Sequence, residues 1–345
     1  MTYYPTLHTL RGFAALWVLL LHSWIFSGQQ SLIFAGFLSF GWVGVHLFYL
    51  LSAFLLGSIY FQNYQKSTWK LSYFYKRRFL RIFPAYYFQL AILLLLSVIG
   101  VYYKFPPIQN LIAHLFLFLN LPPTFDAPMN GVWWTLPIEF GFYLILPLLA
   151  KLLIKFGVYW FLILVFVITY LYRYTIFTNM HDKPIIEISN VIGQLPGVLM
   201  VFSIGLVSAF LLSKNNNIFN RLQNSSVTIT ALILLFIWAN VLLNTENYWS
   251  GSHLLYFWDS VNAFLIMVLI LSIYQSQSKI IANNVLVWLG KVSYGIYLWH
   301  LPVILISKTY IHSFYLMFAV TLPITLVLAS ISYYFVEKKF SQLKS

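Results

Sequence analysis

Long apolar runs are the feature of this sequence that most restricts its fold. Ten segments are apolar enough to form helices across a bilayer: 9–27, 39–60, 82–102, 136–154, 156–172, 195–212, 227–243, 255–274, 293–308 and 314–335. The hydrocarbon core is about 30 Å thick and needs about 20 apolar helical residues, and lipid admits only helices or closed barrels. Because the runs have helix length, we predict an all-α integral membrane protein with about ten transmembrane helices in one bundle.

The composition agrees with this fold class and excludes others. Of 345 residues, 61% are hydrophobic and 8% are charged, against about 25% charged in an average soluble domain. There is no cysteine, so disulfides, thiol nucleophiles and thiolate metal sites are excluded, and we expect no metal. The net charge of +13 could suggest nucleic acid, but its placement beside the apolar runs favours the lipid bilayer as partner and no nucleic acid.

Lysine and arginine fall unequally on the two sides of the ten predicted segments. With the N-terminus inside, sixteen lie at inner loops or helix ends, and four lie outside: Lys104, Arg173, Lys183 and Lys308. The acidic residues expected outside are Asp126, Asp182, Glu187, Glu246 and Asp259. Positive charge marks the cytoplasmic side, so we predict that both termini are cytoplasmic.

We expect residues 1–345 to form a single transmembrane domain without a separate soluble domain, with 110–121 as an interfacial or re-entrant segment.

Five ionisable side chains fall inside the predicted spans: Arg11, His22, His46, Glu139 and His300. Each costs a few kcal/mol or more in lipid and is therefore a functional hypothesis. Arg11 and His22 are eleven positions apart, which is about 20° from three full turns, so they share one helix face. A packed, hydrogen-bonding role is the ordinary alternative for a histidine inside a bundle.

Glu139 and His22 are both expected in the outer half of the membrane. Glu139 lies in the first turn of the fourth predicted helix, and His22 lies about five residues before the outer end of the first. A carboxylate beside an imidazole can orient it and stabilise the imidazolium, as a general base requires. The alternative for Glu139 is a helix-start carboxylate favoured by the helix dipole.

Two further groups of polar residues allow more than one interpretation. Arg78 and Arg81 are three apart on one helical face and could form a fork for a phosphorylated cytosolic ligand, or they could anchor the helix at anionic lipid. Tyr297 and His300 are three apart, and Ser293 and Tyr297 are four apart, so each pair shares a face. Structural hydrogen bonding and lining of a site both remain open for these residues.

Five motifs follow one another along the chain. They are Arg11 and His22 with ten residues between them, the segment GVHLFYLLSAFL from Gly44, Arg78-Phe-Leu-Arg81, the segment WTLPIEFGFY that ends at Tyr143, and SYGIYLWH from Ser293 to His300. In this order they resemble the acyltransferase 3 family of membrane-integral enzymes, which acylate cell-surface glycans and other extracytoplasmic acceptors. The resemblance covers residues 7–302. It departs from the family at His8 and His46, where members often carry aspartate, and at Ala53, which replaces a frequent glycine.

The resemblance implies an enzyme of the bacterial plasma membrane that moves an acyl group from cytosolic acyl-CoA, most often acetyl-CoA, to a hydroxyl of a surface or exported polysaccharide. It assigns the donor to Arg11, Arg78 and Arg81, and catalysis to His22 held by Glu139. Tyr143, Ser293, Tyr297 and His300 would line the path or bind the oxyanion. Direct attack by the acceptor and a covalent acyl-histidine are both compatible with it.

Two other function classes compete with catalysis. A secondary transporter would also place Arg, His and Glu inside a helix bundle, but the sequence shows no paired, Gly- or Pro-interrupted helices in two symmetric halves. A non-catalytic subunit of a glycan-export machine would use the same residues for packing, and binding of CoA would argue against it.

Overall fold

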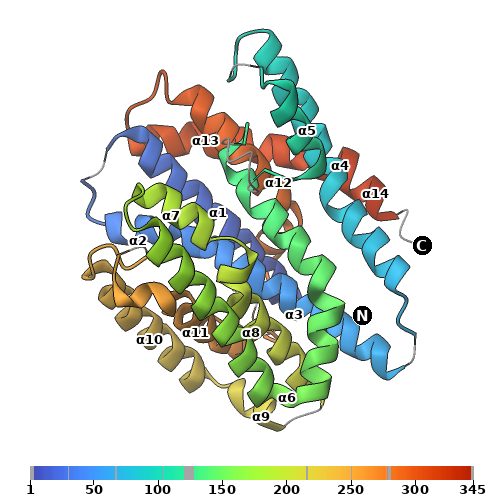
Figure 1. The fold of residues 1–345 in the computed structure, drawn as a ribbon. Helices are drawn as coiled ribbons and strands as arrows, with labels where there is room; N and C mark the ends of the chain where they lie inside the picture. Colours follow the sequence, from blue (N-terminus) through green and yellow to red (C-terminus); the bar gives the residue numbers. More distant parts are fainter. Residues whose placement is uncertain are drawn as a thin grey trace. The chain divides into compact units, whose positions relative to one another are not determined.

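The structure, a computed structural model, describes residues 4–29, 31–66, 68–103, 105–119, 128–214, 217–249, 251–276, 278 and 281–342. These residues are mainly helical, and no strand occurs among them (Figure 1). The α-helices are α1 (Pro5–Ser27), α2 (Ala35–Ser39), α3 (Val43–Gln65), α4 (Leu71–Val98), α5 (Ile108–Phe116), α6 (Thr135–Met180), α7 (Ile185–Ile192), α8 (Leu195–Ser213), α9 (Asn217–Leu222), α10 (Ser225–Leu243), α11 (Trp258–Ile273), α12 (Asn284–Ser307), α13 (Phe314–Ile331) and α14 (Lys338–Gln342). Short 3-10 helices are η1 (Phe40–Trp42), η2 (Gly131–Trp134) and η3 (His253–Tyr256), and η4 (Ser332–Glu337) is a π-helix. The predicted all-α fold is confirmed.

Eight helical stretches among the described residues are long and apolar enough to cross a membrane. Two differences separate this count from the ten predicted segments. Helix α11, which covers most of 255–274, has 16 residues, or about 24 Å of helix. Helix α6 joins the predicted segments 136–154 and 156–172. The protein is a multi-pass membrane protein, and the number of crossings stays a prediction.

Helix α6 consists of two arms that fold back on each other. Gly157 has φ 76° and ψ 172°, which interrupts the helix. In a straight helix Phe142 and Arg173 would lie about 46 Å apart. Phe142 nevertheless stacks on Phe202 at 4.2 Å between ring centroids, and Arg173 Nε donates to the Gly197 carbonyl at 2.8 Å. Both partners lie within about 8 Å of each other on α8, so the arms are antiparallel, as two successive spans would be; the green ribbon turns back near the α6 label in Figure 1.

Two helices begin earlier than their apolar runs. Helix α4 begins at Leu71 rather than at 82, and α12 begins at Asn284 rather than at 293. Hydropathy detects only the apolar part of a helix, whereas the helical hydrogen bonding of the backbone continues into the polar sequence before it. The basic motif with Arg78 and Arg81 is consequently inside α4. The expected interfacial segment 110–121 overlaps α5, which begins two residues earlier, and the last two residues of the segment lie outside the described residues.

The chain divides into two compact units, each assembled from separate stretches. Unit 1 comprises Met1–Leu7, His46–Trp69 and Gly141–Ser278, and unit 2 comprises His8–Val45, Lys70–Phe140 and Lys279–Ser345. In unit 1, α8 packs closely against α3. Phe202 stacks on Tyr49 at 4.5 Å, and a Cβ on Gly205 would lie 2.6 Å from the Leu50 carbonyl oxygen. Small residues allow this backbone approach in a membrane bundle.

Unit 1 also contains an ion pair whose burial the sequence does not predict. Arg173 and Asp259, expected on the outer side, are completely buried and bonded to each other through Arg173 Nη2 and Asp259 Oδ2. Arg173 Nε donates to the Gly197 carbonyl at 2.8 Å, and Nη1 donates to the Leu255 carbonyl at 2.6 Å. The second arm of α6 continues well past the predicted end at 172, which carries Arg173 into the packed interior.

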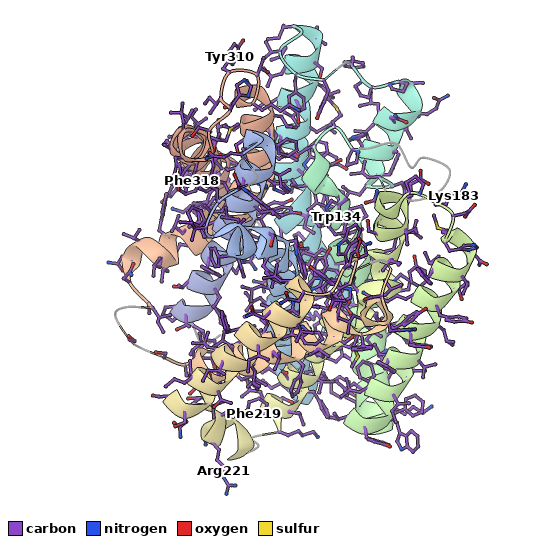
Figure 2. All side chains as sticks on the ribbon, turned by 90° about the vertical axis from the view of Figure 1, so that its left-hand side faces the viewer. Trp134, Lys183, Phe219, Arg221, Tyr310 and Phe318 are labelled. Carbon is purple, nitrogen blue, oxygen red and sulfur yellow. The ribbon has the colours of Figure 1, made fainter. Side chains whose placement is uncertain are left out.

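The two ends of unit 1 carry exposed cations (Figure 2). Lys183, just after α6, and Arg221, at the end of α9, project from opposite ends of this unit. Helix α8, which lies between them in sequence, has 19 residues, about 28 Å of helix. The sequence predicts Lys183 on the outer side and Arg221 on the inner side. A span between them in sequence requires that they lie at opposite ends of the unit, as they do.

Helices of unit 2 alternate in direction as successive membrane crossings must. Tyr294 of α12 donates to the Ile82 carbonyl of α4 at 3.0 Å, and further along both helices Gln89 donates to the Leu298 carbonyl at 2.6 Å, so α4 and α12 are parallel. Glu337, after α13, bonds to Arg81 in the first half of α4, so α13 runs the other way. The predicted relative directions of these spans are confirmed.

Candidate functional site

The motif residues of α12 bring its neighbours into close contact. Helix α12 is the most buried of the eight apolar stretches. A Cβ on Gly290 would lie 1.9 Å from the His8 carbonyl oxygen, so α1 and α12 touch through their backbones. A Cβ on Gly295 would lie 2.8 Å from Ala329 Cα, so α13 approaches equally closely. The two glycines therefore place α12 between α1 and α13.

His22 and His300 meet further along this same pair of helices. A Cβ on Gly12 would lie 2.9 Å from Gly290 N. Ten residues beyond these glycines on each helix, about 15 Å along the axis, His22 Nδ1 lies 2.9 Å from His300 Nε2. The two rings are 5.1 Å apart between centroids and inclined by 27°. His300 is completely buried, whereas His22 is only partly buried.

Tyr297, one turn before His300, is tied to the start of α6. Its hydroxyl donates to the Val132 carbonyl at 2.9 Å and lies 2.8 Å from the Thr135 hydroxyl. Thr135 and Glu139 are four residues apart and share a face of α6, and the Glu139 carboxylate acts electrostatically on the Tyr297 phenol. The ring of Tyr297 is 5.8 Å from that of His300. These contacts bring Glu139 into the neighbourhood of the histidine pair.

A proline near His300 explains a group of buried amides. Pro302 has no N–H, so the Leu298 carbonyl loses its bond within the helix. Gln89 Nε2 and Asn130 Nδ2 donate to this carbonyl at 2.6 Å and 2.8 Å. Trp133 Nε1 in turn donates to Gln89 Oε1 at 2.8 Å. Lipid cannot satisfy a freed carbonyl, so these side chains do so and hold α12 two residues before His300.

Basic side chains gather at the other end of α1 and α12. The charges of Arg11, Lys291 and Arg81 all act on the ring of His8, which places cations from α1, α12 and α4 around one point. His8 lies four residues before Gly12, at the crossing of α1 with α12. The cations are thus about 15 Å along the helices from the histidine pair.

Arg81 is held in place by two neighbours. Its Nη1 lies 2.8 Å from Glu337 Oε2, and its guanidinium lies 5.5 Å from the centroid of the Tyr294 ring. The Arg81 side chain remains 28% exposed, against 3% for Glu337. The exposed part of its guanidinium is the part of Arg81 that an anionic ligand can reach. Arg78 lies one turn earlier on the same face of α4 and is half-buried.

The predicted site residues do not all gather at one place. Unit 2 brings His22, His300, Tyr297 and Glu139 into one neighbourhood, and Arg11 and Arg81 into another. The ring hydrogen bond of His22, which we expected to involve Glu139, goes to His300. Ser293 donates to the Gly290 carbonyl of its own helix at 2.9 Å, and Tyr143 is buried in unit 1, so the site roles expected for these two residues stay predictions.

Sequence reasoning missed His8, Lys291 and Gln89 as neighbours of the site. The signal for Lys291 was its position, two residues before the SYGIYLWH motif. A lone lysine at a helix end is also an ordinary membrane anchor, so the position alone did not indicate a site. Gln89 gave a clearer signal, because an amide inside a span needs a partner and Pro302 frees a carbonyl. Among the described residues, no group of three or more side chains could hold a metal ion.

Comparison with known proteins identifies the family. Residues 4–336 match the sequence profile of the acyltransferase 3 family, which is described as an acyltransferase domain. ORF330 of Acidianus two-tailed virus, an acetyltransferase by name, is 30% identical over 300 residues, which cover 87% of this chain and 83% of that protein.

Two staphylococcal proteins are similar over nearly the whole chain. SACOL0978 of Staphylococcus aureus strain COL, an O-acetyltransferase by name, is 26% identical over an alignment of 386 residues, with 99% of this chain and 58% of that protein covered. The O-acetyltransferase OatA of Staphylococcus aureus strain NCTC 8325 is 25% identical, with 97% of this chain and 57% of that protein covered. The chain thus spans little more than half the length of these two relatives. No solved structure matches it. The chain belongs to the acyltransferase 3 family and is an acyltransferase.

Proposed function

We propose that this protein is an O-acetyltransferase that uses acyl-CoA, with acetyl-CoA as the main donor, and that it acylates a hydroxyl of a surface or exported polysaccharide. Its proposed location is the bacterial plasma membrane, with both termini in the cytoplasm and residues 1–345 acting as one transmembrane domain. The observation that carries the proposal is the His22–His300 pair, which lies inside a helix bundle whose other end holds the basic cluster at His8.

The basic end of unit 2 is the proposed donor site. CoA carries phosphate groups, and arginine binds phosphate through parallel N–H donors. Arg11, Arg78 and Arg81 are the proposed ligands, and Lys291 joins them because its charge reaches the same point as those of Arg11 and Arg81. A long, chain-like arm would carry the thioester along α1 and α12 toward His22.

His22 is the proposed general base. It takes the proton of the acceptor hydroxyl while the hydroxyl oxygen attacks the thioester carbonyl carbon. The carbon–sulfur bond then breaks, and the CoA sulfur receives the proton that His22 held, so the products are an ester and free CoA. Glu139, close to Tyr297, would stabilise the transient imidazolium, and Tyr297 would line the path beside it.

Mass spectrometry of surface glycans tests the reaction directly. Cells that express the gene should carry glycans heavier by one acetyl group than those of a deletion strain, and the purified protein should release free thiol from acetyl-CoA. Absence of both signals would overturn the proposed function.

Donor binding can be tested separately with paired variants. Arg78→Ala with Arg81→Ala should weaken CoA binding more than Lys338→Ala with Lys339→Ala, which removes two cations from the same end of unit 2. Equal weakening would show that only general charge matters, and would remove the arginine fork from the proposal.

A further inference from the structure

The two histidines form a hydrogen-bond chain with a definite direction. The Ile296 carbonyl oxygen lies 3.0 Å from His300 Nδ1, and a carbonyl can only accept, so His300 Nδ1 carries a proton. The other nitrogen of a neutral imidazole is then an acceptor. His300 Nε2 therefore accepts the bond from His22 Nδ1 at 2.9 Å, and His22 carries its proton on Nδ1.

The surroundings keep both rings neutral at rest. His300 is completely buried, and neither ring forms an ion pair within the described residues. The groups that face His22 on its own helix are the Val18 carbonyl and the Phe26 ring, and Tyr297 faces His300. A carboxylate on another element, Glu139 of α6, acts on Tyr297. A resting imidazolium at His300 would be a buried charge without a counter-ion, which is costly.

The Nε2 atom of His22 is the ring nitrogen that can accept a proton from a substrate. With its proton on Nδ1, His22 has its lone pair on Nε2. The Val18 carbonyl, the other hydrogen-bond partner of this ring, can only accept and therefore does not occupy that lone pair. His22 is also the more exposed member of the pair. The buried ring thus stands behind the accessible one, as an orienting group stands behind a catalytic base.

The helix that carries His300 is fixed around it. Tyr297 is bonded to Val132, and the Leu298 carbonyl receives two amide donors, Gln89 and Asn130. His300 is thereby held within one turn of two anchored residues. A partner held in this way can set the orientation of a base to within the tolerance that catalysis requires.

We propose that His300 is a positioning residue that fixes the tautomer of His22 and directs its Nε2 lone pair at the acceptor hydroxyl. This inference rests on the proposed function and assigns the base to one atom. During the reaction Nε2 gains the hydroxyl proton and returns it to the CoA sulfur, while His300 accepts the same hydrogen bond throughout and neither gains nor loses a proton. The orienting partner is a neutral ring, in contrast to the carboxylate expected from the sequence.

Three variants of the full-length protein in lipid nanodiscs test this role by thiol release from acetyl-CoA. His300→Phe keeps a ring but removes the acceptor, and His300→Gln places an acceptor oxygen near the position of Nε2. The matched control is Thr321→Ala, a completely buried residue of unit 2 whose hydroxyl bonds only to its own helix. His300→Phe should lower kcat by about 10²-fold with KM for acetyl-CoA within about threefold, and His300→Gln should recover at least tenfold of that loss.

The outcomes separate this role from the proposed function. Wild-type protein that releases no thiol would overturn the proposed function and this role together. In an active wild type, a folded His300→Phe with full kcat would overturn the role alone. Equal loss in His300→Phe and His300→Gln, both folded by their melting temperatures, would also overturn it, because a packing role does not depend on the acceptor atom.

Discussion

The Arg173–Asp259 pair of unit 1 and the His22–His300 pair of unit 2 differ in how completely their hydrogen-bonding atoms are satisfied. In unit 1, all three kinds of guanidinium nitrogen of Arg173 have acceptors: the Gly197 carbonyl, the Leu255 carbonyl and Asp259. In unit 2, the chain that starts at the Ile296 carbonyl ends at His22, whose Nε2 lone pair has no donor among the described residues.

The difference indicates which pair stabilises the fold and which pair can take part in a reaction. A buried charge is tolerated when paired and fully hydrogen-bonded, and such a saturated pair has no donor or acceptor left for a substrate. A pair that stops at an accessible lone pair can act on one. The Arg173–Asp259 pair is therefore assigned to stability and the His22–His300 pair to catalysis, and the following changes test this division.

Removing the accessible histidine should produce the largest effect. His22→Ala should lower kcat for acetyl transfer by about 10²- to 10⁴-fold, the usual contribution of a general base. Stability should change little, because the hydrogen bonds of the His22 ring to His300 and to the Val18 carbonyl are each worth about 1 kcal/mol. Thiol release and melting temperature in nanodiscs measure the two effects, and a residual rate within tenfold of wild type would remove His22 from catalysis.

Breaking the saturated pair should give the opposite pattern. Arg173→Met leaves the Asp259 carboxylate buried without its partner, so it should lower the free energy of unfolding by about 3–5 kcal/mol. The kcat of the molecules that remain folded should be unchanged. Adding Asp259→Leu should restore most of the stability, because the unpaired charge is then gone. A stable single variant, or a double variant no better than the single one, would contradict the structural assignment.

The amides behind α12 should have an intermediate effect. Gln89→Leu removes one of two donors to the Leu298 carbonyl and leaves Trp133 Nε1 without its acceptor. We expect a loss of about 1–3 kcal/mol in the free energy of unfolding, the cost of unsatisfied buried polar groups. Ser97→Ala is the control on the same helix, because Ser97 bonds only to its own backbone. Equal melting temperatures for the two variants would count against this role of Gln89.

Protonation of His114, a histidine outside the proposed catalytic site, should have the smallest effect on the free energy of unfolding, and this effect should depend on pH. In α5, His114 Nδ1 donates to the Asn110 carbonyl at 2.5 Å, and Nε2 accepts from Met129 N at 3.0 Å. Burial lowers the pKa of His114 below its ordinary value in spite of the Asn110 bond. Its contribution to stability is therefore complete above the unfolded pKa of about 6.5 and is lost as the pH falls toward the lowered folded pKa.

The comparison variant for this residue is His114→Gln, which does not titrate. Between pH 7.5 and pH 5.5 the wild type should lose about 1 kcal/mol more than the variant, the worth of the bond from Met129. Melting curves at the two pH values measure this difference. Parallel losses in both proteins would show that His114 does not titrate with unfolding.

The sequence predicted the helices well and the pairings poorly, for a physical reason. Apolar runs and local spacing report on one helix at a time. The sequence could therefore predict the membrane-protein class, the positions of the apolar helices and the shared helix face of Tyr297 and His300. The bond from His22 to His300 joins residues 278 positions apart, and no local pattern encodes it. Glu139 was chosen as the partner because a carboxylate is the commoner one. Burial of Arg173 was missed because the apolar run ends before the helix does.

The position of one proton tests the central claim most directly. Ring nitrogen-15 NMR of histidine-labelled protein in lipid, with His22→Gln and His300→Gln used for assignment, distinguishes a protonated from an unprotonated ring nitrogen. We predict that at neutral pH both His22 and His300 carry the proton on Nδ1, with a bare Nε2 on His22. A His22 ring protonated on Nε2 would contradict the assignment of that atom as the base.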